Sequence, residues 1–217
     1  MALIEDSCLR GCKGKVGGLV VYRLGDRTVV RTVVRTVGER ESGEFSAGQR
    51  AQQERIASVA ILYKSMKAAG LHKGWQDAVR GTALTGYNEF VRRNVSAFSG
   101  DGRIADFGKL QLTAGRLLLP DKLEVCRSGK DEVEMRWSNE RLYPGMRGDD
   151  RIMAAMMKRK DVFTIKILNA EENSRERGRV RIRLPPELEC FPHLFVYACS
   201  ATGEEFSVSR YFYSFKI

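Results

Sequence analysis

Histidine is scarce in this 217-residue chain, which contains only His72 and His193. Neither lies in a recognisable motif, whereas nucleophilic catalysis needs a base placed beside the nucleophile. The acidic pairs Asp149-Asp150 and Glu171-Glu172 are adjacent residues in predicted loops, where carboxylates are usually solvated. The sequence therefore offers no catalytic residue, no metal site and no cofactor motif, and we expect a protein that is not an enzyme.

Long apolar runs are also missing. No stretch approaches the ~20 apolar residues of a membrane helix, so we expect no membrane span. The first ten residues carry Glu5 and Asp6 and lack the apolar segment of a signal peptide. An odd number of cysteines without a secretory signal predicts reduced thiols and a cytoplasmic location. The five cysteines are Cys8, Cys12, Cys126, Cys190 and Cys199.

Acidic residues are the minority among the charges. The chain has 37 Lys and Arg against 27 Asp and Glu, a formal net charge of +10. This balance favours anionic partners such as nucleic acid, acidic protein surfaces or membrane head groups. A solvated basic surface that keeps the protein soluble is the alternative, because acidic residues are interspersed among the basic ones.

The N-terminal part reads as a basic β-hairpin arm. Strands are predicted over Val16–Arg23 and Arg27–Val37, with Gly25-Asp26 as turn residues. Residues 8–37 hold seven Lys or Arg and one acidic residue. Side chains alternate along a strand, so Arg27, Arg31 and Arg35, which lie four residues apart on the second strand, project from one face. The candidate residues for nucleic-acid or anion binding are Arg23, Arg27, Arg31, Arg35, Lys13 and Lys15.

A two-stranded basic ribbon of this kind can enter a DNA groove or follow phosphates. The alternative is an edge ribbon packed on the helices, with outward arginines that prevent aggregation.

Helical signals follow the arm. Ser46 and Gln49 match a capping box, and apolar residues recur at helical spacing from Ile56 to Met66. Gly70 is a plausible end of this helix. Further helices are predicted at 75–79 and 85–98, then a strand over Lys109–Leu119, with Pro120-Asp121 as a domain joint.

The second half of the chain reads as a series of short strands. Apolar and polar residues alternate in Arg179–Leu184, as in a strand buried on one face. Seven such strands with turns between them predict an immunoglobulin-like or fibronectin-like sandwich, with Trp137 buried between its sheets. The predicted fold is α+β and mostly β, with an arm and small helical region at 1–119 and a seven-stranded antiparallel sandwich at 120–217. The strands are expected near 122–127, 132–138, 151–157, 161–168, 178–184, 193–201 and 206–215.

Two further surfaces are candidates on the sandwich. If Leu194, Val196 and Ala198 face the core, their neighbours face outward and form a partner surface, unless the helical region covers them. This candidate partner surface consists of Phe195, Tyr197, Tyr211 and Tyr213. A secondary basic surface consists of Lys158, Arg159, Lys160, Arg179, Arg181 and Arg183.

The sequence resembles two known families. Trp137, the Leu184-Pro185 crossover, and Ala198 followed by Gly203 are similar to the pattern of fibronectin type III repeats. The opening Gly11-Cys12-Lys13-Gly14-Lys15-Val16-Gly17, followed by Val20-Val21-Tyr22-Arg23, resembles that of an uncharacterised family of the Bacteroidota, a domain of unknown function. Tyr87-Asn88 with Val91 and Asn94, and Leu112 to Gly115, resemble later segments of that family. The second resemblance implies this architecture and a bacterial origin, and it implies no functional residue.

These features predict a non-enzymatic binding or structural protein that binds nucleic acid or another polyanion through its basic arm. The alternative is a protein–protein interaction module, or a homo-oligomer, in a mobile-element, phage-like or surface assembly that uses the sandwich.

Overall fold

The computed structural model covers the whole chain and describes residues 2–4, 12–24, 27–33, 45–129, 131–140, 143–158, 163–168, 170, 173–184 and 193–213. The chain divides into two compact units, Met1–Phe45 and Ser46–Ile217. None of the helices in these described ranges is long and apolar enough to cross a membrane.

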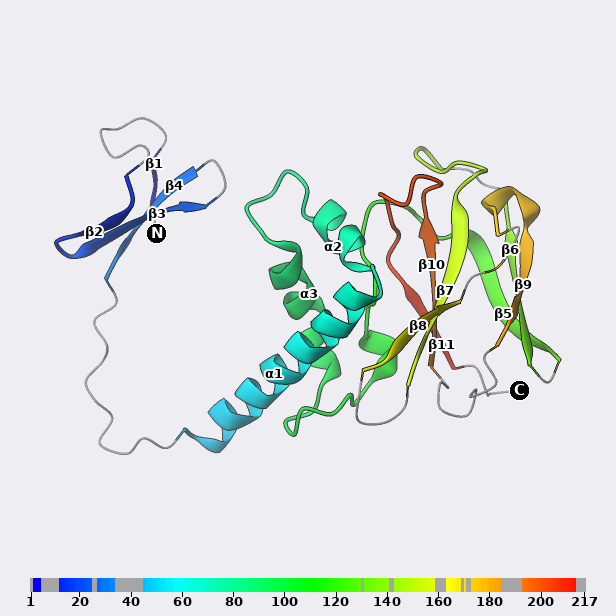
Figure 1. Cartoon of the computed structure of the whole chain (residues 1–217), viewed down its shortest axis with the longest axis horizontal. Coiled ribbons are helices and arrows are strands. Elements are labelled where there is room, and N and C mark those ends of the chain that lie inside the picture. Colours follow the sequence, from blue (N-terminus) through cyan, green and yellow to red (C-terminus); the bar gives the residue numbers. More distant parts are fainter. Residues whose placement is uncertain are drawn as a thin grey trace. The chain divides into compact units, whose positions relative to one another are not determined.

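The first unit contains a four-stranded antiparallel sheet (Figure 1). The predicted hairpin is present, but a turn at Gly17 and Gly18 divides its predicted first strand, Val16–Arg23, between two strands. Gly17 has a φ of +56°, which glycine adopts without strain and which a tight hairpin turn requires. The predicted continuation over Val34–Val37 lies outside the described residues. In spatial order, the strands are β1 (Ala2–Ile4), β4 (Arg27–Thr32), β3 (Leu19–Leu24) and β2 (Gly14–Val16).

The second unit begins with helices. The capping box predicted at Ser46 is confirmed, because its side chain accepts a bond from the Gln49 N–H and the Gln49 side chain accepts one from the Ser46 N–H. The Thr85 hydroxyl caps the third helix by accepting a bond from the Asn88 N–H. The helices are α1 (Ala47–Ala68), α2 (His72–Ala78) and α3 (Gly86–Asn94), followed by short 3-10 turns at Val95–Ala97 and Phe107–Lys109.

The predicted seven-stranded β-sandwich is confirmed in the second unit, where one sheet has three strands and the other has four. Trp137 lies in the core between the sheets, as predicted, with 7% of its surface exposed. The three-stranded sheet has the order β5 (Asp121–Gly129), β6 (Glu132–Ser138) and β9 (Arg179–Arg183). The four-stranded sheet has the order β11 (Arg210–Tyr213), β10 (His193–Cys199), β7 (Arg151–Met157) and β8 (Ile165–Leu168).

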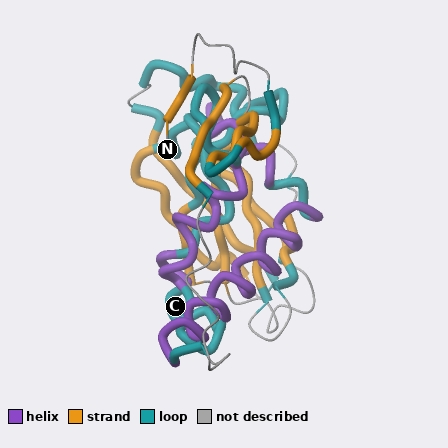
Figure 2. The backbone as a smooth tube through the Cα atoms, turned by 90° about the vertical axis from the view of Figure 1, so that its left-hand side faces the viewer, coloured by secondary structure: helices purple, strands orange, loops and turns teal. Residues whose placement is uncertain are grey.

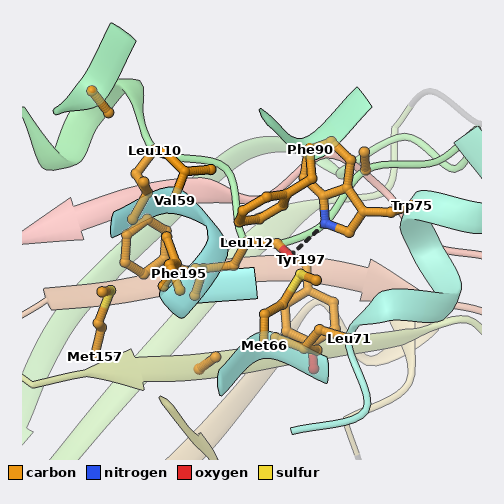
Figure 3. Close-up of a cluster of buried hydrophobic side chains, with 14 of the residues drawn as sticks. Val59, Met66, Leu71, Trp75, Phe90, Leu110, Leu112, Met157, Phe195 and Tyr197 are labelled. Carbon is orange, nitrogen blue, oxygen red and sulfur yellow. Dashed lines mark hydrogen bonds between the residues drawn. The ribbon is translucent and has the colours of Figure 1, made fainter. Parts of the chain in front are cut away.

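The helices add a third layer on the outer face of the four-stranded sheet, and Figure 2 shows them in front of its strands. Trp75 and Phe90 from the helices share one buried cluster with Phe195 and Tyr197 from β10 (Figure 3). The central strands of this sheet, at 193–199 and 151–157, are therefore buried on both faces. The helical region and the sandwich belong to one compact unit, which does not divide at residues 119 and 120.

The strand predicted over Lys109–Leu119 is wrong. This segment is irregular and pairs with the sandwich through one isolated bridge, between Leu117 and Ser207. Hydrogen bonds to side chains satisfy its backbone instead of a strand ladder. The amide of Asn94 bonds both the N–H and the C=O of Gln111, and the Trp75 indole donates to the Leu112 carbonyl at 3.0 Å (Figure 3).

Candidate nucleic-acid interface

The strand pairing of the first unit brings basic residues from different strands onto one face. Lys15 pairs with Val20 across β2 and β3, and Val20 pairs with Arg31 across β3 and β4. Paired residues of an antiparallel sheet project from the same face, and so does Tyr22, two residues beyond Val20. We call the surface of Lys15, Val20, Tyr22 and Arg31 the Lys15–Arg31 face.

The basic side chains of this face are open to solvent. Lys15 and Arg31 are exposed and Tyr22 is half-buried. The Arg31 guanidinium lies over the Tyr22 ring, 5.6 Å from its centroid, which stabilises an exposed pair of this kind by about 0.5–1 kcal/mol. Neither Lys15 nor Arg31 forms an ion pair within the described part of the chain. Among the described residues, no carboxylate therefore occupies these two charges.

The other predicted residues of the arm do not all join this face. Arg23 pairs with Thr28 and projects from the opposite face, since it neighbours Tyr22 on β3. Lys13 is exposed just before β2. Arg27 begins β4 and pairs with Leu24, but its side chain and the whole of Arg35 lie outside the described structure. Of the predicted row at 27, 31 and 35, the structure describes the side chain of Arg31.

Acidic residues compensate part of the secondary basic surface. Arg179, Arg181 and Arg183 are exposed along β9, as the alternation predicted. However, Arg183 pairs with Glu132, and Arg181 with Glu134, on the neighbouring strand β6. The Arg181 Nε lies 3.2 Å from one carboxylate oxygen of Glu134, and Arg136 contacts the other oxygen.

Hydrogen bonds from Arg136, and then from Arg181, hold the pKa of Glu134 below its ordinary value. Arg181 and Arg183 therefore lie in a ladder of opposite charges, whereas Arg179 lies opposite Arg136. Lys158 is exposed at the end of β7, while Arg159 and Lys160 lie outside the described residues.

The predicted aromatic partner surface is wrong for two of its four residues. Phe195 and Tyr197 are 0% and 2% exposed, because the helical layer covers that face of β10. Tyr211 is half-buried, and its hydroxyl bonds the Nδ1 atom of His193 at 2.9 Å. Tyr213 is exposed at the end of β11. The four residues therefore do not form a continuous surface.

An apolar groove on the second unit has no signal in the sequence. It encloses about 560 Å³ between the irregular segment 108–121 and the start of β11. Leu118, Tyr143 and Val208 line it with exposed apolar surface, and Leu118 is 49% exposed. These residues come from three distant segments, so only the tertiary structure brings them together.

Other chemistry finds no support within the described residues. They contain no group of three or more His, Cys, Asp or Glu side chains that could hold a metal ion. Cys126 and Cys199 are free thiols, and burial raises the pKa of Cys199. Cys8 and Cys190 lie outside the described part.

No protein-family model, curated protein or solved structure matches the chain. The resemblances of the opening segment and of the sandwich to known families therefore remain predictions.

Proposed function

We propose that this protein is a non-enzymatic binding protein that holds a polyanion, nucleic acid above all, on the sheet of its first unit. The contrast between its two sets of basic residues supports this proposal. Lys15 and Arg31 are exposed on strands that carry no acidic residue, whereas Arg181 and Arg183 of β9 lie opposite Glu134 and Glu132.

The physical basis is electrostatic. An exposed cation without a carboxylate partner can neutralise a phosphate and release its condensed counterions, and this release drives binding. An arginine that already pairs with a buried glutamate would first have to give up that pair. A cytoplasmic setting, which the cysteines predict, agrees with such a partner.

Salt dependence tests the proposal. Fluorescence anisotropy measures the binding of the full chain to labelled random-sequence oligonucleotides. The logarithm of the association constant should fall linearly with the logarithm of the salt concentration. The double variant Lys15→Gln/Arg31→Gln should reduce this slope by about 1.5, because each lost phosphate contact removes about 0.7–0.9.

The double variant Arg181→Gln/Arg183→Gln removes the same charge from arginines that lie opposite glutamates in the sandwich. It is the matched control and should leave the slope unchanged. No binding at low salt, or equal effects of the two double variants, would contradict the proposal.

The groove supports a second candidate function, a protein–protein interaction module. Three strands facing four is the arrangement of many immunoglobulin-like sandwiches, which often serve as binding modules. Leu118, Tyr143 and Val208 provide exposed apolar surface there. Association that Leu118→Lys abolishes, and that salt leaves unchanged, would favour this function over the first.

A further inference from the structure

The hairpin of the first unit is not a bare ribbon. Strand β2 lies beside residues 19–21 of β3, and β1 lies beside residues 28–30 of β4. A third strand therefore accompanies every cross-strand pair of the hairpin except the last, between Leu24 and Arg27. At the pair of Val21 with Val30, all four strands lie side by side.

This width decides how the sheet can meet a nucleic acid. Adjacent strands lie about 4.8 Å apart, so three strands span about 10 Å and four about 14 Å before side chains are counted. The major groove of DNA is about 12 Å wide and admits a two-stranded ribbon. Insertion into a groove is therefore sterically unfavourable along the three- and four-stranded part of the hairpin, which presents a face instead.

The Lys15–Arg31 face combines charge with a ring. Lys15 and Arg31 lie two strand spacings apart, about 10 Å, on either side of Val20. Tyr22 follows on the central strand and carries the guanidinium of Arg31 over its ring. Basic side chains that contact phosphates, beside an aromatic ring or a guanidinium plane on which a base can stack, are the features that bind single strands.

We infer that the Lys15–Arg31 face binds single-stranded nucleic acid in preference to duplex. In a duplex the faces of the bases are stacked on one another and cannot reach Tyr22, whereas the bases of a single strand can. This inference rests on the proposed polyanion binding and adds the class of ligand.

The test compares a single-stranded oligonucleotide with a duplex of the same sequence and length, at one ionic strength, using the full chain. The single strand should bind more tightly. Tyr22→Leu should weaken single-strand binding by about tenfold, because stacking of one base contributes about 1–3 kcal/mol, and it should leave duplex binding unchanged. Tyr22→Phe retains the ring and should bind like the original chain.

Tyr143→Leu, which removes an exposed tyrosine from the second unit, is the control and should have no effect. Circular dichroism checks that each variant folds. If Tyr22→Leu does not fold, Tyr22→Phe, which preserves the packing of the ring, is the variant that is measured. Tighter binding of duplex, an unaffected Tyr22→Leu, or a Tyr22→Phe as weak as Tyr22→Leu would overturn the inference while leaving polyanion binding intact. Absence of binding to both ligands would overturn both.

Discussion

Glu89 shows at the residue scale how this protein stabilises a buried charge. The carboxylate is 3% exposed near the start of α3 and accepts hydrogen bonds from Arg92 and Arg93 at 2.6–2.8 Å. The bond from Arg92 is the largest influence on its pKa, and it outweighs the opposing effect of burial. With the bonds and charges of both arginines, the pKa falls to about 2.

The stability of the protein should therefore depend on this group in acid. A pKa lowered by folding contributes stability above the unfolded value, about 4.3, and the contribution is lost as the pH falls towards 2. Glu89→Gln should cost about 1–3 kcal/mol in the free energy of unfolding at neutral pH. Denaturant titrations should show this difference shrinking below about pH 4.3. Glu54→Gln, at an exposed position on α1, is the control. A difference in unfolding free energy between the original chain and Glu89→Gln that stays constant down to pH 3, about one unit above the pKa in the folded protein, would contradict the lowered pKa of Glu89.

At the element scale, a short 3-10 turn over Arg175–Arg177 ties several segments together. The Arg175 side chain is 1% exposed, and its Nε lies 3.4 Å from a carboxylate oxygen of Asp150. Its Nη2 donates to the Leu118 carbonyl at 2.6 Å, and its own carbonyl accepts from the Trp137 indole at 2.7 Å. The turn therefore joins the sandwich core, the loop before β7 and the segment that leads into β5.

Removing one partner of this ion pair should be costly. Arg175→Met should lower the free energy of unfolding by about 3–5 kcal/mol, because Asp150 would stay buried without a counter-charge. The double variant Arg175→Met/Asp150→Leu should recover much of that loss, since a buried pair of charges contributes little net stability. Thermal and urea unfolding measure both, with the exposed Arg179→Met as the control. A double variant less stable than Arg175→Met would disprove this account of the pair.

At the scale of the whole molecule, the second unit is three layers around two buried clusters. The clusters meet at the four-stranded sheet, whose strand β10 contributes Phe195 and Tyr197 to one and Leu194 and Val196 to the other. Helices and sandwich should therefore unfold together and not in separate steps.

Substitutions on either side of the shared cluster test this cooperativity. Phe90→Ala in α3 and Phe195→Ala in β10 should each cost about 3–5 kcal/mol, because each leaves a cavity in the same core. Amide hydrogen exchange should show the helices and β7 losing protection in parallel in both variants. Val208→Ala, at an exposed position, should change neither the free energy of unfolding nor the protection of the amides. Loss of protection confined to the helices in Phe90→Ala would indicate two independent units.

Local signals in the sequence determined much of this fold. The capping box of Ser46 and Gln49 depends on residues three apart, and the exposed arginines of β9 follow from alternation within five residues. The separation of Arg23 from Arg31 is local too, because Arg23 neighbours Tyr22 on its strand. Each of these features depends on residues close together along the chain, so each can be predicted from the sequence.

Only the tertiary structure decided the rest, because its causes lie far apart along the chain. The run Leu194–Ala198 is apolar throughout, so its sequence is consistent with burial on one face or on both. It is buried on both faces because the helical layer from residues 47–94 covers the face that the sandwich core does not. The segment 109–119 is predicted as a strand, but its N–H groups donate hydrogen bonds to the side chains of Asn94 and Ser209, which hold it in an irregular path. The width of the first sheet depends on β1 and β2 pairing with opposite sides of the hairpin, and this pairing makes a sheet of the predicted two-stranded ribbon.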